Sequence, residues 1–227
     1  MISKPKRFGL KDYRAMHKAA GIRLPVAYFK NNHLFDLMNG TDTHSWIQKE
    51  DFIERPDNFE HGVLYMSSWT SVIRDSLSYL LDNAQLAVTD IALIDIGCGK
   101  GKVLCVWNKL LKKHPDIPII GLDYSQSLLN ICTRNIKKLR AVNTRLFNED
   151  ATTMDFSFDR NINVYYLYNP FDNKILQQFI KNINNKPCYV IYNNPVHKKT
   201  FTEHDFKLIT EKKGWHPNAS YAIYQFP

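Results

Sequence analysis

The sequence predicts an α/β fold built on a mainly parallel sheet, and three observations support this class. From Ile91 onward, short apolar runs alternate with amphipathic stretches of helical spacing. The runs are apolar throughout rather than alternating, which is typical of parallel strands covered on both faces by helices. A chain of 227 residues is long enough for one such domain with an appendage.

Five apolar runs predict the parallel strands, in the order 91–96, 119–124, 145–147, 164–168 and 189–192. The stretches between them predict helices near 103–111, 128–139 and 175–180, with Ser125 as a cap of the second. Two further strands are expected near 206–210 and 221–226, separated by Gly214 and Pro217-Asn218. The expectation is therefore a seven-stranded sheet that ends in an antiparallel C-terminal hairpin.

The chain divides by pattern into residues 1–88, a helical N-terminal extension or cap, and residues 89–227, the core. Within the extension, residues 67–81 have helical spacing, and Ser67 or Ser68 is expected to cap that helix. Between the fifth strand and the hairpin there is little room for a covering helix, and Pro195 shortens it further. That edge is expected to be open or covered by the N-terminal region.

The formal net charge of +8 makes an anionic partner, such as nucleic acid, one possibility. Six basic residues are concentrated in the first twenty: Lys4, Lys6, Arg7, Lys11, Arg14 and Lys18. Other basic pairs are scattered, and scattered charge does little more than keep a protein soluble. Charge alone leaves both interpretations open.

No uncharged apolar stretch approaches about eighteen residues, so no membrane span is expected. The basic segment 1–10 has no apolar core of its own and does not resemble a secretory signal. The four cysteines form no CxxC pair and no metal-ligand spacing, so no metal site is expected. Reduced, buried thiols in a cytoplasmic protein are the simplest account.

The segment Asp95-Ile96-Gly97-Cys98-Gly99-Lys100-Gly101 follows a predicted strand and opens a helix. Glycines there let the backbone turn sharply and approach a ligand where a Cβ would collide. A dinucleotide fold, the first competing interpretation, needs a small residue at position 102. Lys102 occupies that position, which disfavours NAD and an oxidoreductase.

Polar residues follow three other strands, where ligands of parallel sheets bind. Asp123 lies 22 residues after Gly101 and can accept both hydroxyls of a ribose, with Tyr124 against an adenine face. Asp123 could instead only cap the next helix. The segments 148–151 and 168–171 follow the third and fourth strands, and the second of these contains Asn-Pro, a common turn signal.

This set of motifs resembles the class I, Rossmann-like methyltransferases that use S-adenosylmethionine (SAM), whose first motif is an acid followed by GxGxG. The resemblance implies that Asp95 and the backbone of the glycine loop hold the methionine end of SAM and its ribose. Asp150 would accept a hydrogen bond from the adenine amino group. The resemblance thus implies a set of cofactor-binding residues: Tyr65, Asp95, Gly97, Cys98, Gly99, Gly101, Asp123, Tyr124, Asp150, Ala151 and Asn169.

In methyltransferases of amines and amides, a loop of the form Asn/Asp-Pro-Pro-aromatic orients a nitrogen after the fourth strand. The resemblance implies that Asn169 and Phe171 are the catalytic residues. Here the second proline is missing, so N-methylation stays open. Tyr65 and Ser67 or Ser68 resemble an N-terminal helix that closes over SAM, although Tyr65 could equally be core.

The layout most resembles bacterial methyltransferases with a Tyr-Asn-Pro-Phe loop and no defined substrate, and more loosely the lysine methyltransferases of the histone H3 core. The predicted function is SAM-dependent methyl transfer to an unidentified acceptor: a small molecule, a protein or a nucleic acid. Methyl transfer needs alignment more than a base, and no base stands out in the sequence. The alternative is a non-catalytic Rossmann-like module that binds nucleic acid or protein through a basic surface.

Overall fold

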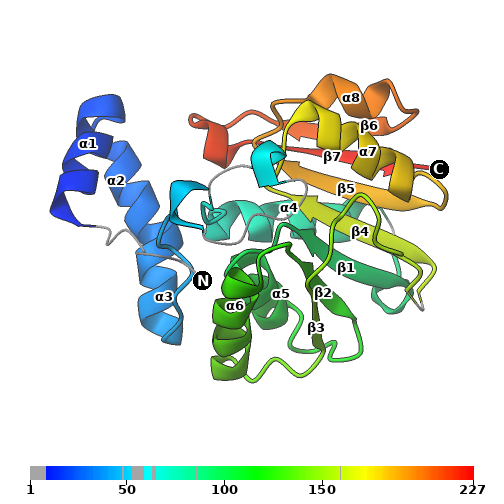
Figure 1. Cartoon of the computed structure of the whole chain (residues 1–227), viewed down its shortest axis with the longest axis horizontal. Coiled ribbons are helices and arrows are strands. Elements are labelled where there is room, and N and C mark those ends of the chain that lie inside the picture. The colour runs from blue at the N-terminus through cyan, green and yellow to red at the C-terminus, as the bar shows by residue number, and fades with distance from the viewer. Residues whose placement is uncertain (1–8, 48, 53–58, 63–64, 85, 159) are drawn as a thin grey trace.

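The computed structural model describes residues 9–47, 49–52, 59–62, 65–84, 86–158 and 160–227 (Figure 1). Three of the basic residues noted in the sequence, Lys4, Lys6 and Arg7, lie outside this set. So do two residues, 63 and 64, that precede Tyr65.

A seven-stranded sheet forms the centre of the molecule, with the strand order β3-β2-β1-β4-β5-β7-β6. The strands are β1 (Ile91–Ile96), β2 (Ile119–Leu122), β3 (Thr144–Phe147), β4 (Ile162–Leu167), β5 (Cys188–Asn193), β6 (Lys207–Lys212) and β7 (Tyr221–Phe226). Strands β1 to β5 are parallel, and β7 runs antiparallel between β5 and β6. The predicted fold class is confirmed, including the C-terminal hairpin.

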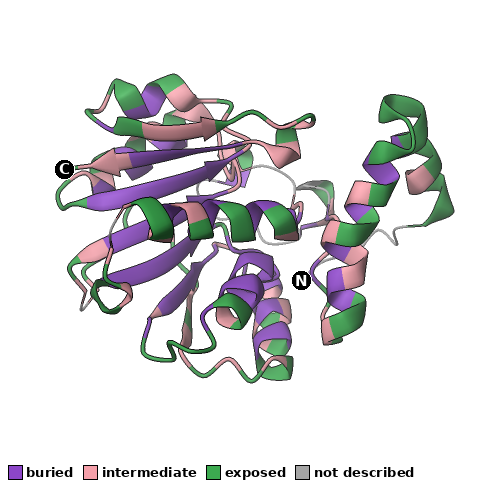
Figure 2. Cartoon of the chain, turned by 180° about the vertical axis from the view of Figure 1, so that it is seen from behind, coloured by how far each residue is buried: buried purple, intermediate pink, exposed green. Residues whose placement is uncertain are grey.

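Helices cover both faces of this sheet. On one face lie α4 (Thr70–Asn83), α5 (Lys102–Leu110) and α6 (Gln126–Lys138), and on the other lie α7 (Asn173–Ile183) and α8 (Lys198–Thr202). The alternation of side chains along β4 shows the two cores, because Val164 and Tyr166 join the first and Tyr165 and Leu167 join the second. The inner strands β1, β2, β4 and β5 are accordingly buried almost throughout, whereas the edge strands β3 and β6 are half-buried or exposed (Figure 2).

Helix α4 begins at Thr70, with Trp69 at the capping position, so the prediction of a Ser67 or Ser68 cap is wrong. Both serines are buried instead, and Trp69 stacks on His216 of the β6–β7 loop with 12° between the rings. Since α4 packs on α5 and β7, it forms part of the layer over the sheet. The division at residue 88 remains a prediction.

The region between β5 and β6 holds one short helix, α8, despite Pro195. Phe201 of α8 is fully buried and stacks on Tyr224 of β7, with ring centroids 4.6 Å apart. The Phe201 side chain therefore covers this part of the sheet, whereas longer helices cover the other strands.

The N-terminal arm, residues 9–39, is helical as predicted. It consists of α1 (Leu10–Ala20), α2 (Arg23–Tyr28), the π-helical turn η1 (Phe29–His33) and α3 (Leu34–Asn39). The arm lies to one side of the sheet (left in Figure 1). The described 3-10 turns are η2 (Lys49–Asp51), η3 (Phe59–His61), η4 (Val88–Asp90) and η5 (Pro217–Ala219).

Candidate active site

The loop after β1 is tied to the end of β2 by Asp123. One carboxylate oxygen of Asp123 accepts a hydrogen bond from the backbone N–H of Gly99 at 2.8 Å, and the other accepts one from Ser125 N–H at 2.8 Å. Ser125 in turn caps α6, because its hydroxyl accepts from Leu128 N–H, as predicted. Asp123 also lines the cavity described below.

Gly99 is glycine because of a neighbouring ring in the protein itself. Its φ is +53°, and a Cβ added there would lie 2.1 Å from the ring of Tyr65. Tyr65 is held in this position by its hydroxyl, which donates to Thr43 O at 2.8 Å. The space beside Gly99, predicted from the sequence to admit a ligand, is occupied by the ring of Tyr65.

A buried carboxylate, Asp36, shapes the segment that holds Tyr65. Its oxygens accept hydrogen bonds from the backbone N–H groups of Thr43 (2.7 Å) and His44 (2.9 Å) and from the hydroxyls of Thr41 (2.5 Å) and Thr43 (2.8 Å). The Nδ1 atom of His44 lies 2.6 Å away as well. Burial by itself raises the pKa of Asp36, but hydrogen bonds from His44, Thr41 and Thr43 lower it well below its usual range.

Asn135 of α6 connects the same segment to the glycine loop. Its amide pairs with the backbone of Asp42, accepting from N–H at 2.9 Å and donating to C=O at 3.0 Å. The same amide donates to Lys100 O at 2.9 Å. Asp36 and Asn135 were not predicted from the sequence as site residues. Each is a polar residue on the apolar face of an amphipathic helix, and this pattern could have indicated a buried polar role.

Lys102, which argued against a dinucleotide fold, is buried at the start of α5. Its ammonium group donates to Asn31 O at 3.0 Å and lies 3.8 Å from the ring centroid of Phe35, both in the arm. Burial lowers the pKa of Lys102 to about 7, against the opposing effect of Asp36. A dinucleotide fold needs a small residue at this position, whereas here Lys102 binds the arm to the core.

Asp95 is 3% exposed, and no hydrogen-bond donor within the described residues reaches its carboxylate. Burial and then the charge of Asp123 raise the pKa of Asp95 well above its usual range. A buried carboxylate that faces a cavity without a partner suits a cationic group of a ligand.

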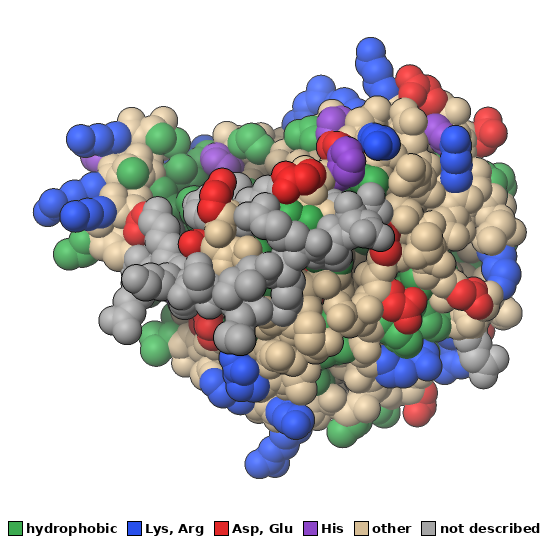
Figure 3. All heavy atoms as spheres, viewed as in Figure 1, with side chains coloured by type: hydrophobic (Ala, Val, Ile, Leu, Met, Phe, Trp, Pro, Cys, Tyr) green, Lys and Arg blue, Asp and Glu red, His purple; other side chains and the backbone are tan. Residues whose placement is uncertain are grey.

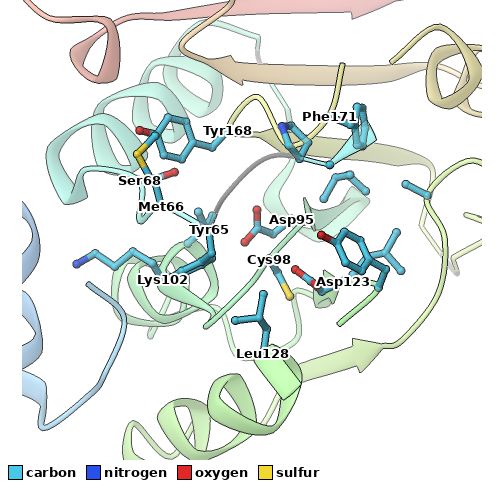
Figure 4. A pocket seen from close by; sticks show the side chains of 18 of the residues that line it. Tyr65, Met66, Ser68, Asp95, Cys98, Lys102, Asp123, Leu128, Tyr168 and Phe171 are labelled. Atoms are coloured by element: carbon cyan, nitrogen blue, oxygen red, sulfur yellow. The ribbon is translucent and has the colours of Figure 1, made fainter. Parts of the chain in front are cut away.

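These elements enclose a cavity of about 350 Å³ at the carboxyl ends of β1, β2, β3 and β4. Figure 4 shows the carboxylates of Asp95 and Asp123 near Cys98, with Tyr168 and Ser68 toward another side. The cavity is lined by predicted site residues and by additional ones, namely Phe52, Gly62, Tyr65, Met66, Ser67, Ser68, Asp95, Ile96, Gly97, Cys98, Lys102, Val103, Leu122, Asp123, Tyr124, Leu128, Asn148, Glu149, Asp150, Ala151, Tyr168, Pro170, Phe171 and Ile175. Its volume lies at the lower end of the range for small-molecule sites.

Most of the predicted site residues meet in this cavity, and three do not line it. The lining residues among them are Tyr65, Asp95, Gly97, Cys98, Asp123, Tyr124, Asp150, Ala151 and Phe171. Gly99 and Gly101 lie behind, where added Cβ atoms would meet Tyr65 and, at 2.4 Å, Cys132 Sγ.

Asn169 is the third. Its φ is +43°, a conformation that asparagine tolerates better than most residues. Its side-chain carbonyl accepts a hydrogen bond from the hydroxyl of Tyr192 in β5 at 3.0 Å. The loop therefore presents Tyr168, Pro170 and Phe171 to the cavity, and the catalytic and cofactor roles of Asn169 remain predictions.

One rim of the cavity is closed by a clasp between two distant segments. Gly62 forms an isolated antiparallel bridge with Phe171, and His61 Nδ1 lies 2.7 Å from Asp172 Oδ2. Asp172 also caps α7, accepting from Ile175 N–H at 3.1 Å. Phe171 is thus fixed between the clasp and Phe179 of α7, with ring centroids 5.9 Å apart.

The residues predicted to lie beside the adenine, Tyr124 and Asp150, are ordered by local contacts. Tyr124 lies edge-on to Phe59 at 6.1 Å, and burial followed by the charge of Asp123 raises its pKa to about 12. Asp150 accepts from the N–H and hydroxyl of Thr152 at 2.8 and 2.7 Å. Both side chains line the cavity, which agrees with the prediction without testing it.

All four cysteines are buried and free. Among the described residues, no group of three or more His, Cys, Asp or Glu is arranged to hold a metal ion. None of the described helices combines the length and apolarity needed to cross a membrane.

Comparison with known proteins agrees with this geometry. A curated tRNA (guanine-N(7)-)-methyltransferase of Bacillus velezensis is 30% identical over 98 residues, which cover 36% of this chain and 44% of that protein. The chain thus aligns with less than half the length of this relative.

Two solved structures share the fold. Precorrin-6y C5,15-methyltransferase of Geobacter metallireducens is 19% identical, with a TM-score of 0.50 over 69% of this chain and 89% of that one. A mutant of MtNAS in complex with SAM is 10% identical, with a TM-score of 0.51 over 68% of this chain and 61% of that one. At these identities the likeness is one of fold alone.

A sequence family described as a methyltransferase domain matches residues 88–221, which is more than half of the chain. The match covers the glycine loop, the acids at the strand ends and the Asn-Pro-Phe loop together. The chain therefore belongs to the methyltransferase domain family, and its core is the Rossmann-like, SAM-dependent methyltransferase domain that the sequence predicted.

Proposed function

We propose that the protein binds SAM in the cavity at the carboxyl ends of β1, β2 and β3 and transfers its methyl group to a nucleophile that enters beside Tyr168 and Phe171. The observation that carries this placement is Asp95, a buried carboxylate that lines the cavity and has no donor among the described residues. The methionine end of SAM carries the ammonium group that such a carboxylate requires.

Other residues that line the cavity fit the rest of the cofactor. Asp123 lines the cavity and would accept hydrogen bonds from the ribose hydroxyls, while Tyr124, Asp150 and Ala151 line the part proposed for the adenine. SAM supplies an activated methyl group, so the chain has only to align the acceptor and exclude water. A nucleophile forms a bond to the methyl carbon as the carbon–sulfur bond breaks, and a proton on the acceptor passes to solvent.

Tyr168, Phe171 and Ser68 line the part of the cavity that these assignments leave for the acceptor. Two aromatic side chains and small hydroxyl groups suit a planar acceptor. The tRNA methyltransferase named above makes a nucleobase one candidate. We further propose a cytoplasmic location, on the basis of four free cysteines.

Calorimetry with S-adenosylhomocysteine (SAH) tests the placement. The wild-type protein is expected to bind SAH, and Asp95→Asn to weaken binding about tenfold or more, because a hydrogen bond to a charged group contributes about 1.5–3 kcal/mol. Asp90→Asn is the matched control, because this exposed carboxylate precedes β1 at the opposite edge of the sheet. Equal affinity in Asp95→Asn overturns the placement, and no binding by wild type at millimolar SAH overturns the function.

A further inference from the structure

We infer that the N-terminal arm, together with Trp215, forms a binding platform for single-stranded nucleic acid and presents one unpaired base to the cavity as the methyl acceptor. This inference rests on the proposed function, because it names the class of acceptor for the same site. It is argued from the distribution of charge, from exposed aromatic rings and from their connection to the cavity.

Most of the net charge of +8 belongs to the arm and the residues before it. Residues 1–39 contain eight Lys or Arg and two acidic residues, whereas the remaining 188 residues contain 22 basic and 20 acidic ones. Within the described part of the arm, all of the basic residues are exposed: Lys11, Arg14, Lys18, Arg23 and Lys30. Figure 3 shows Lys and Arg atoms at the end of the molecule where the arm lies.

The acidic groups of the arm do not neutralise this charge at its surface. Asp12 is occupied at the start of α1, where its carboxylate accepts from Gly9 N–H at 2.8 Å. Asp36 is buried and accepts hydrogen bonds from three neighbouring residues. The exposed cations are therefore available to phosphate groups, which dominate the affinity of proteins for nucleic acids.

Exposed aromatic rings accompany these cations. The guanidinium of Arg23 lies 4.3 Å from the ring centroid of Trp215, which remains 40% exposed. Phe29 is 45% exposed and lies parallel to the ring of His33 at 6.1 Å. Proteins that bind single strands combine a basic surface with rings on which successive bases stack.

A continuous series of contacts joins this platform to the cavity. Trp215 lies 5.8 Å from Trp69, and Trp69 directly follows Ser68, which lines the cavity. The preceding residue, Ser67, also lines it, and its buried hydroxyl has no hydrogen-bond partner among the described residues. A base in the cavity would thus meet the Ser67 hydroxyl, which can form a hydrogen bond with the base edge.

The arm also exposes apolar side chains, among them Leu10, Ile22 and Leu37, so an anionic membrane is the competing partner. The aromatic platform favours nucleic acid, because Arg23 and Trp215 connect to the cavity through Trp69 rather than extending the apolar surface. A base is also planar, as the aromatic lining of the cavity requires.

The test is fluorescence anisotropy of the whole protein with labelled RNA and DNA oligonucleotides of mixed sequence, about 20 nucleotides long, at about 50 and about 200 mM KCl. Wild type is expected to bind one or both, more weakly at the higher salt. Trp215→Ala should weaken binding roughly tenfold, the effect of losing one stacked base, and Trp215→Phe should retain most of it.

The charge variant Arg14→Gln/Lys18→Gln should lower the dependence of log affinity on log salt by about 1.4, since each of the two lost contacts with a single strand contributes about 0.7. The control Lys112→Gln/Lys113→Gln changes two exposed cations after α5, at the edge of the sheet opposite the cavity, and should leave binding unchanged. All four variants should bind SAH as wild type does.

Equal weakening by the control pair, or no binding of either oligonucleotide by wild type, overturns the inference. Binding to phosphatidylcholine–phosphatidylserine vesicles without binding to oligonucleotides also overturns it, in favour of a membrane. SAH binding distinguishes failure of the proposed function from failure of the platform. If the wild type does not bind SAH, the proposed function is refuted. If it binds SAH but no oligonucleotide, only the platform is refuted.

Discussion

The two sides of the cavity are built in different ways. The sheet side consists of a glycine loop and acids at the ends of β1, β2 and β3, held by contacts between neighbouring parallel strands. On the covering side lies Tyr65, which residues 41–47 hold in position. That segment is in turn fixed by the buried polar side chains of Asp36 and Asn135. The first is a product of strand order, and the second depends on a few buried hydrogen bonds. The cover is therefore the side that single substitutions should loosen first.

The largest effect is expected from Gly99→Val, because the new side chain would clash with Tyr65 on the covering side. Its Cβ would meet the ring of Tyr65, and overpacking costs typically about 1–3 kcal/mol, with about 1–3 kcal/mol more for the left-handed backbone. We expect SAH binding to be lost and the free energy of unfolding in urea to fall by about that sum.

The double variant Gly99→Val/Tyr65→Ala should recover part of the stability if the ring is the obstacle. Gly9→Ala, where an added Cβ meets nothing within 4 Å, is the control. A Gly99→Val protein as stable as wild type would contradict the close contact between loop and cover.

The next effect comes from Asp36→Asn, which should loosen the cover and spare the sheet. An amide offers one acceptor oxygen in place of two and adds a donor, which leaves hydrogen bonds from Thr41, Thr43 or His44 unmade at about 1–3 kcal/mol. Hydrogen exchange should accelerate in residues 34–47 and stay slow in β1 and β4. Equal acceleration in both regions would mean that cover and sheet unfold together.

The same carboxylate makes the cover sensitive to acid. The pKa of Asp36 is lowered in the folded protein, so its stabilising contribution is complete above the unfolded value of about 3.9 and is lost as the pH falls below that value. The protection of residues 34–47 against hydrogen exchange, relative to the intrinsic exchange rate at each pH, should therefore decrease below about pH 4. In Asp36→Asn this pH dependence should disappear.

A smaller effect concerns Asp95 and the pH dependence of cofactor binding. The pKa of Asp95 is raised in the free protein, and a cationic ligand binds the ionised form. SAH affinity should therefore increase with pH across the titration of Asp95, and binding should release a proton in calorimetry with buffers of different ionisation enthalpy. The increase should be absent in Asp95→Asn, and a wild-type affinity that falls with pH would contradict the assignment.

The smallest expected effect is that of Tyr192→Phe, which removes only the hydrogen bond to the side chain of Asn169. If Asn169 serves the cofactor or the acceptor, its release should weaken SAH binding or slow turnover by a few-fold, in line with about 1 kcal/mol for one hydrogen bond. Asn169→Ala should lose turnover and reduce SAH affinity more modestly. Unchanged SAH affinity and turnover in both variants would leave Asn169 as a turn residue.

The sequence alone predicted where the strands lie and which acidic residues follow them. Apolar runs and helical spacing located β1 to β7, and the rule that parallel strands end at one edge brought Asp95, Asp123 and Asp150 together. Ser125 as a helix cap was equally readable, because capping is a local interaction. Such features depend on residues a few positions apart or on the topology of the sheet.

The tertiary structure decided what covers the cavity and which way individual side chains face. Asp42 and Asn135 pair across 93 positions, and Tyr65 lies on Gly99 because Thr43 holds its hydroxyl. The side chain of Asn169 accepts a hydrogen bond from Tyr192, and Trp69 occupies the capping position of α4 that was predicted for a serine. Periodicity specifies which face of an element is buried, but it does not specify which distant polar group satisfies a buried donor or acceptor. The pairing of such groups depends on how distant segments pack together, and this packing leaves no local pattern in the sequence.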